Sequence, residues 1–192
     1  MKKHGLRNWI LGPVLFIILS GCAVNSRPGL NNSFPDKAFL IPDVPFFPQK
    51  DQLCGPASLQ SVFAYWGKQY SQEEISKAIY LPQIKGTFNF DLVNFAQLKG
   101  FRTELPAGSI EEIERQIKAS HPVIAFLNLG NSIFPLGHYI VIIGFDHMTR
   151  ELIFHSGQHE YEKMNYRTFG NQWESTDRWM LVILPPAEKS GR

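Results

Sequence analysis

The feature of this sequence that most constrains its fold is a change of pattern near residue 120. Before that point, polar capping residues open apolar stretches with helical spacing, whereas after it short β-branched and aromatic runs alternate with turn residues. Helices followed by an antiparallel sheet form an α+β domain, not an alternating parallel fold. The pattern predicts helices at 54–66, 71–80, 90–99, 109–120 and 168–174, and strands at 121–127, 138–145, 151–155, 160–165 and 179–184.

The composition is that of a folded protein with no large charge. The 192 residues match the length of about one domain. Hydrophobic residues make up 44% and charged residues only 19%, which excludes a disordered or collagen-like chain. Without the three basic residues of the first seven positions, the 19 basic and 17 acidic residues become 16 and 17, a net charge of −1. A near-neutral body lacks the positive surface that binds nucleic acid, so we expect no nucleic-acid partner.

The first 22 residues have the pattern of a bacterial lipoprotein signal peptide. Lys2, Lys3 and Arg7 precede an apolar run at 9–19, which is too short to span a bilayer. The Leu-Ser-Gly-Cys sequence that ends at Cys22 resembles the lipobox, in which the cysteine becomes the lipid-modified N-terminus. The alternative is an ordinary secretory signal that ends near a cysteine.

These features divide the chain into a signal peptide at 1–21, a tether at 22–40, a domain at 41–186 and a C-terminal tail at 187–192. The tether is rich in Asn, Ser, Pro and Gly and has no periodicity, which is typical of a linker. Ala23 in place of aspartate favours, by resemblance to Gram-negative lipoproteins, sorting to the outer membrane. We therefore expect a protein anchored by lipid in the bacterial cell envelope, on the periplasmic face of the outer membrane.

Cys54 is the one cysteine besides Cys22, so lipidation of Cys22 leaves a single thiol in an oxidising compartment. The simplest interpretation of Cys54 is a small buried hydrophobe. Its position favours a reactive thiol, because it begins the predicted 54–66 helix, where free backbone N–H groups and the helix dipole stabilise an anion. The sequence therefore predicts a thiol of lowered pKa, which is what a cysteine nucleophile requires.

Two further residues can complete a nucleophilic site around Cys54. Gln49 lies upstream on an extended segment, from which its amide can donate to a developing oxyanion. The alternative for Gln49 is a solvated loop glutamine. His138 begins an apolar strand directly after Pro-Leu-Gly, and that strand has no packing need for a histidine. His138 is therefore the candidate general acid–base, with a structural histidine as the alternative.

Three short segments combine into a specific pattern. Val44–Gln49 reads Val-Pro-Phe-Phe-Pro-Gln, Cys54–Ala57 reads Cys-Gly-Pro-Ala, and Gly137–Asp146 reads Gly-His-Tyr followed by hydrophobic residues and Gly-Phe-Asp. Together they resemble the papain-like double-glycine peptidase family, found as the leader-removing domain of bacteriocin exporters. The resemblance extends from Asp43 to Leu184. Within the family, the chain looks closest to a free-standing lipoprotein branch whose members lack transporter segments.

The resemblance implies a papain-like α+β fold with N-terminal helices packed on an antiparallel sheet. It also implies Cys54 as nucleophile, His138 as general acid–base and Gln49 in the oxyanion hole. We expect no metal and no cofactor. The family usually has an aspartate after the next strand to orient the histidine, whereas Ser156 stands there in this chain. A serine accepts a hydrogen bond but carries no charge to stabilise an imidazolium, so Ser156 is a weakened third member.

Two neighbouring residues limit the alternatives. Asp146 is a turn residue of the motif and is not assigned to the site. His155 alternates with Ser156 along the strand, so only one of the two can face the site.

Three functions stay open. The first is hydrolysis of a peptide bond in an exported polypeptide by a membrane-anchored, monomeric cysteine peptidase. The second is a tethered peptide-binding module that cuts nothing. The third is a cell-wall amidase or other acyl transfer, for which His155 is a small argument because such enzymes of the same clan normally have a polar third residue such as histidine.

Overall fold

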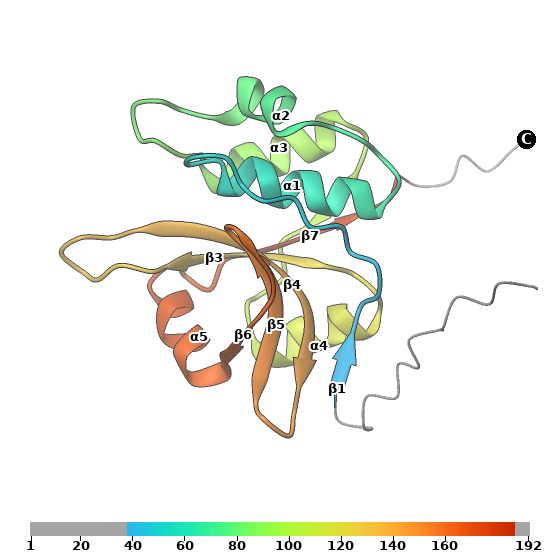
Figure 1. The fold of residues 1–192 in the computed structure, drawn as a ribbon, viewed down its shortest axis with the longest axis vertical. Helices are drawn as coiled ribbons and strands as arrows, with labels where there is room; N and C mark the ends of the chain where they lie inside the picture. The colour runs from blue at the N-terminus through green and yellow to red at the C-terminus, as the bar shows by residue number, and fades with distance from the viewer. Residues whose placement is uncertain (1–37, 187–192) are drawn as a thin grey trace, which may run out of the picture. The chain divides into compact units, whose positions relative to one another are not determined.

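Helices and strands separate into layers in the computed structural model, which describes residues 38–186 (Figure 1). The upper layer in Figure 1 contains α1 (Cys54–Tyr65), α2 (Gln72–Ile79) and α3 (Asn89–Leu98). Below it lies a seven-stranded sheet, with α4 (Ile110–Lys118) packed against β4 and α5 (Tyr166–Glu174) packed against β3. This arrangement confirms the predicted α+β class.

The sheet is antiparallel at each of its pairings and has β4 near its centre. Its strand order is β2-β7-β3-β4-β5-β6, and β1 pairs with β4 beside that path. The strands are β1 (Ala38–Leu40), β2 (Arg102–Glu104), β3 (Val123–Asn128), β4 (Gly137–Asp146), β5 (Glu151–Ser156), β6 (His159–Asn165) and β7 (Met180–Leu184).

Each predicted helix is present, with ends that shift within the usual variation of helix boundaries. The capping box at the start of α2 is complete, because the Ser71 side chain accepts from the Glu74 N–H and Glu74 Oε2 accepts from the Ser71 N–H at 2.8 Å. At the start of α4 only one half forms: Ser109 accepts from the Glu112 N–H at 3.0 Å, while the Glu112 carboxylate pairs with Arg115. The Ser-Ile-Glu-Glu sequence at 109–112 therefore forms only half of a capping box.

Two short strands, β1 and β2, are not predicted from the sequence. Strand β1 lies within the stretch assigned to the tether, so the end of that tether moves from residue 40 to residue 37 at the latest. Strand β3 pairs with β4 from Gly137 to Ile142, and β1 pairs with β4 beyond that point, from Gly144 to Asp146. Gly144 permits this pairing, because a Cβ at that position would lie 2.7 Å from the Phe39 carbonyl oxygen.

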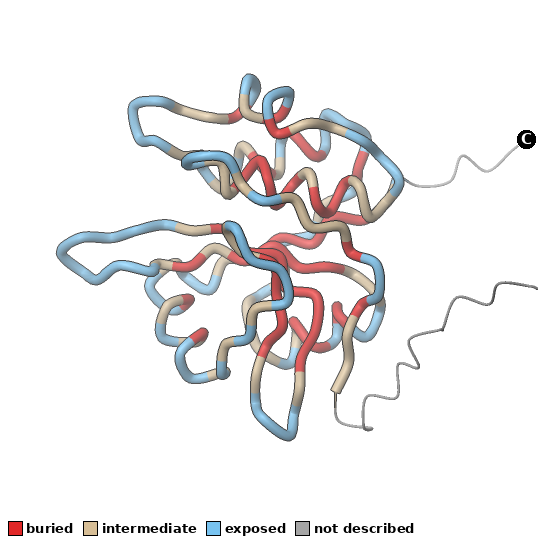
Figure 2. The backbone as a smooth tube through the Cα atoms, viewed as in Figure 1, coloured by how far each residue is buried: buried red, intermediate tan, exposed pale blue. Residues whose placement is uncertain are grey.

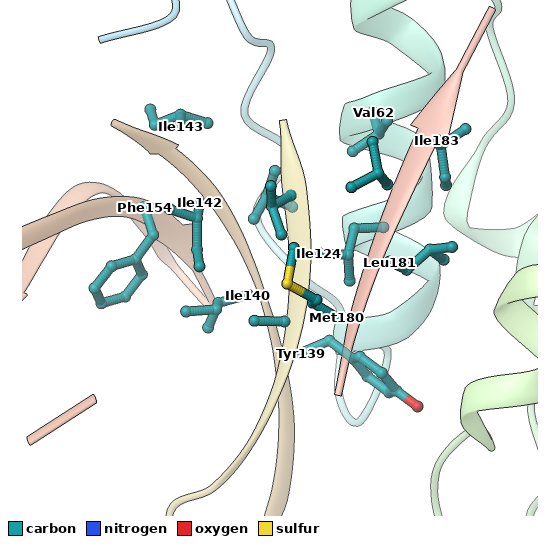
Figure 3. Close-up of a cluster of buried hydrophobic side chains, with 14 of the residues drawn as sticks. Val62, Ile124, Tyr139, Ile140, Ile142, Ile143, Phe154, Met180, Leu181 and Ile183 are labelled. Atoms are coloured by element: carbon teal, nitrogen blue, oxygen red, sulfur yellow. The ribbon is translucent and has the colours of Figure 1, made fainter. Parts of the chain in front are cut away.

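The hydrophobic core fills the space between α1 and the central strands. Figure 2 shows buried backbone along α1 and the middle of the sheet, and Figure 3 shows the aliphatic side chains that β3, β4 and β7 contribute. Strand β4 is buried without interruption from Tyr139 to Phe145, whereas Gly137 is exposed and His138 is half-buried. His138 therefore lies where the strand leaves the core and reaches accessible surface.

Within residues 38–186, no helix combines the length and hydrophobicity that crossing a membrane requires. The predicted signal peptide at 1–21, Cys22 and the tail at 187–192 lie outside the described residues.

Candidate active site

Cys54 is the first residue of α1, as the sequence predicts. No side chain caps this helix, since its N-cap residue Leu53 makes no capping hydrogen bond. The backbone groups of Tyr139, on strand β4, of Gly55 and of Cys54 itself lie near enough to the sulfur to favour its thiolate form. The nucleophile candidate therefore contacts the strand that carries His138.

The prediction of a lowered Cys54 pKa is wrong for the free protein. Burial raises the pKa of the thiol, and the nearby backbone groups of Tyr139, Gly55 and Cys54 offset that effect only in part. Although the residue as a whole is partly exposed, protein atoms replace most of the water around its sulfur, which disfavours the thiolate. The sequence identifies the donors at a helix start but not the sheet that buries the sulfur.

His138 is held by Ser156, which ends strand β5. The two side chains share a hydrogen bond of 2.9 Å between His138 Nε2 and Ser156 Oγ. This contact occupies Nε2 and leaves Nδ1 as the ring nitrogen that can exchange a proton with a reacting group. Burial lowers the pKa of His138, so the imidazole favours its neutral form.

His155 lies next to Ser156 but has a different environment. Its side chain is buried, with Nε2 3.1 Å from the Val44 carbonyl oxygen and Nδ1 accepting from the Tyr161 N–H at 3.3 Å. These partners fix a neutral tautomer with hydrogen on Nε2, and burial lowers its pKa accordingly. Ser156, not His155, therefore contacts His138, which removes the argument for an amidase that His155 provided.

Gln49 is anchored next to the end of strand β5. Its backbone N–H donates to the Gly157 carbonyl at 2.9 Å, directly after Ser156. Its Oε1 is buried and has no hydrogen-bond partner among residues 38–186. With this oxygen turned inward, Nε2 is the end of the amide left to donate to a substrate, as the predicted oxyanion role requires.

A cleft of about 770 Å³ brings the three predicted residues together, since Gln49, Cys54 and His138 all line it. One wall of this cleft is residues 84–88, between α2 and α3, and the other is residues 135–139 with Phe126. Gly137 permits the close packing of the second wall, because a Cβ there would lie 2.5 Å from the Phe126 ring. The wall side chains are mainly apolar: Ile84, Phe88, Phe126, Leu129, Pro135 and Leu136.

Ser156 lines a second, much smaller cavity, which Cys54 also lines. This cavity of about 20 Å³ is also lined by Gln49, Ser58 and His155. Because Ser156 does not line the larger cleft, it can orient His138 without contacting a molecule there.

Asp146 lies apart from these residues. Within residues 38–186, no group of three His, Cys, Asp or Glu side chains could hold a metal ion. Asp146 ends β4 at the opposite end from His138, and its Oδ1 accepts from the Met148 N–H at 2.8 Å, as expected of a turn residue.

A family model described as the peptidase C39-like family matches residues 41–179, which include every residue of the site. The chain belongs to the peptidase C39-like family. This finding confirms the family that the motifs resemble, whereas the lipoprotein branch stays a prediction. A comparison with curated proteins found no match.

Solved structures resemble this C39-like domain over most of its length. The peptidase domain of Streptococcus ComA, a bifunctional ABC transporter of a quorum-sensing pathway, has a TM-score of 0.61 at 23% identity, covering 74% of this chain and 98% of that chain. A double-glycine motif protease from an AMS/PCAT transporter, solved with a leader peptide, has 0.53 at 20%, covering 74% and 91%. Xylellain, a cysteine protease from Xylella fastidiosa, has 0.56 at 13%, covering 78% and 86%. At these identities the likeness establishes the fold, and the predicted papain-like α+β fold is confirmed.

The sequence alone does not reveal two components of the cleft. One is the Tyr139 backbone beside the sulfur, which leaves no signature in residue type because it is a backbone group. The other is the 84–88 wall, which lies between helices and has no periodicity. The position of Tyr139 directly after His138 is the one available signal for the first of these.

Proposed function

We propose that this C39-like domain is a cysteine peptidase that hydrolyses a peptide bond in an exported polypeptide, with Cys54 as nucleophile and His138 as general acid–base. The observation that carries the proposal is the meeting of Cys54, His138 and Gln49, from three separate segments, in one cleft. The cleft has a polar centre and apolar walls, a combination that suits an extended peptide.

The reaction starts from a neutral pair. Burial raises the pKa of Cys54 and lowers that of His138, so the thiol keeps its proton and the imidazole is a free base. His138 removes the thiol proton as the sulfur attacks the substrate carbonyl, and the Gln49 amide donates to the oxyanion that forms. The imidazolium then protonates the leaving amine, which leaves a thioester on Cys54.

Water completes the cycle. His138, again neutral, accepts a proton from a water molecule that attacks the thioester, and the thiol leaves with a proton from the imidazolium. Ser156 holds the ring at Nε2 throughout. Because Ser156 is uncharged, it stabilises the imidazolium less than an aspartate would.

The experiment that tests this function is peptide cleavage by the full-length protein in detergent. The wild type should cut a member of a peptide library that includes Gly-Gly sequences, following the double-glycine relative. Mass spectrometry would identify the products, and Cys54→Ala should produce none. Cleavage by the Cys54→Ala variant at the wild-type rate would contradict the proposal.

A peptide-binding module that cuts nothing is the second candidate. Two observations favour it: the raised pKa of Cys54, and Ser156 in the position of the usual aspartate. Binding of library peptides to the wild type without any cleavage would select this function.

We also propose that the protein acts as a lipid-anchored monomer on the periplasmic face of the outer membrane. The support for the lipid anchor is the lipobox-like segment that ends at Cys22, and the support for the outer membrane is Ala23 directly after it. In a Gram-negative host, Cys22→Ala should remain unprocessed or leave the outer-membrane fraction, as seen by immunoblotting. An alanine variant that is processed and fractionates like the wild type would contradict this proposal.

A further inference from the structure

The 84–88 wall of the cleft belongs to a turn that is closed by its own hydrogen bonds. The Leu81 N–H donates to the Gly86 carbonyl at 2.8 Å, and the Gly86 N–H returns to the Leu81 carbonyl at 3.3 Å. The wall residues Ile84 and Phe88 are 48% and 44% exposed, so apolar packing restrains them only weakly. Such a turn has a defined shape, but its position over Cys54 depends on contacts from outside.

Tyr139 of strand β4 supplies a contact of this kind. Its hydroxyl lies 2.6 Å from Asn89 Oδ1 and 3.1 Å from the Thr87 carbonyl oxygen. Among residues 38–186, no other residue of the sheet donates a hydrogen bond to Thr87 or Asn89. Figure 3 shows the Tyr139 ring extending away from the strands with its hydroxyl outermost.

The same residue contacts the start of α1. The Tyr139 backbone lies beside the Cys54 sulfur, and a Cβ added to Gly55 would lie 3.4 Å from both the Tyr139 ring and the Thr87 side chain. The ring therefore fills the space between the nucleophile's helix and the wall. Burial raises the pKa of Tyr139, so its hydroxyl keeps the proton that it donates.

We propose that Tyr139 is a positioning residue: its hydroxyl holds the 84–88 wall against the strand of His138 and so sets the width of the cleft above Cys54. The part of this inference that concerns substrate rests on the proposed function. The part that concerns the wall rests on the hydrogen bonds to Thr87 and Asn89 alone.

The first test measures the wall without any substrate. Tyr139→Phe removes the hydroxyl and keeps the ring, and Tyr65→Phe is the matched control, because the Tyr65 hydroxyl donates to the Ser120 carbonyl at 3.0 Å away from the cleft. Hydrogen exchange of full-length protein, read by mass spectrometry, should be about fivefold faster over residues 84–88 in Tyr139→Phe, as expected for the loss of one hydrogen bond. Exchange there in Tyr65→Phe should match the wild type.

The second test measures the consequence for a peptide. A fluorescein-labelled peptide containing Gly-Gly-Ala should bind Tyr139→Phe about fivefold more weakly than the wild type, in a Cys54→Ala background that prevents turnover. Asn89→Ala should weaken binding in the same direction, and Asn89→Asp, which keeps an acceptor oxygen, should restore most of it. When Tyr139→Phe is made in the protein that keeps Cys54, the KM for peptide cleavage should rise more than kcat falls. Alkylation of Cys54 by iodoacetamide, which is too small to need the wall, should keep its wild-type rate.

The outcomes separate this inference from the proposed function. Exchange over 84–88 that is no faster in Tyr139→Phe than in Tyr65→Phe would overturn the inference, as would a uniform increase across the domain. A loosened wall with unchanged peptide affinity and KM would overturn the positioning role. A loosened wall in a protein that cleaves no peptide would support the role of Tyr139 in holding the wall and would contradict peptidase activity.

Discussion

The two sides of the cleft are built in different ways. On the sheet side, His138 and Ser156 lie on adjacent strands whose pairing register fixes their separation. On the helical side, Cys54 depends on where α1 begins, and the 84–88 wall depends on a self-closed turn and the Tyr139 hydroxyl. A ladder of backbone hydrogen bonds resists local displacement more than a turn does. We therefore expect the imidazole to be rigidly placed and the wall above Cys54 to be the adjustable part.

The comparison also explains the protonation state of the site. Helix α1, which begins at Cys54, packs on β4, the strand of His138, and both side chains are largely withdrawn from water. This burial raises the pKa of Cys54 and lowers the pKa of His138. Packing of the two layers therefore creates the cleft and favours the neutral pair at the same time.

The largest expected effect comes from the sheet side. His138→Ala should lower kcat for peptide cleavage by about a hundred- to ten-thousandfold, because it removes the group that moves both protons. The thermal midpoint should change little, since His138 lies at the accessible end of β4. His159→Ala is a matched control, an exposed histidine at the start of β6. Equal activity in the two variants would mean that the sheet side carries no catalytic group.

A smaller effect is expected from the oxyanion donor. Gln49→Ala should reduce kcat by about a hundredfold, with a smaller change in KM, because an oxyanion forms only in the transition state. Gln97→Ala on α3, where the side chain donates to Thr103, should behave like the wild type. A Gln49→Ala variant that changes KM alone would assign this residue to substrate binding.

The pH dependence of alkylation tests the neutral pair directly. Because burial raises the pKa of Cys54, the rate of its reaction with iodoacetamide should increase with pH and reach half its maximum above about 8.5, the value of an ordinary thiol. The rate can be followed by mass spectrometry of the full-length protein. A midpoint well below that of an ordinary thiol would indicate a preformed ion pair, as the helix-start argument predicts.

The pKa of His138 is shifted in the opposite direction from that of Cys54, and the pH dependence of peptide cleavage tests this shift. Burial lowers its pKa, so the imidazole remains a free base to lower pH than an ordinary histidine does. The acid limb of kcat/KM should therefore lie below about 6.5. An acid limb above that value would mean that the charged imidazole is stabilised.

The smallest effect is expected at Ser156. Ser156→Ala removes one hydrogen bond to His138 Nε2 and should lower kcat about fivefold. Ser156→Asp should keep or increase activity and move the acid limb of kcat/KM to higher pH, because a carboxylate raises the pKa of the imidazole. A Ser156→Ala variant as inactive as His138→Ala would show that the hydroxyl does more than orient the ring.

Much of the fold and the chemically reactive residues follow from local sequence. Capping residues and apolar spacing predict the helices, and β-branched runs predict the five longer strands, because these signals act over a few neighbouring positions. Strands β1 and β2, each of three residues, are too short to show a period, and they form because they pair with β4 and β7. The same locality explains why Cys54 is identified as the first residue of a helix.

The relations across the fold are decided by tertiary structure. The sequence predicts Cys54, His138, Gln49 and Ser156 as separate residues, and packing of the helical layer on the sheet brings the first three into one cleft. The choice of Ser156 over its neighbour His155 follows from which one meets His138 across the sheet. The direction of the Cys54 pKa shift is likewise a tertiary effect, because a helix start favours the thiolate whereas the strand packed over it removes water from the sulfur.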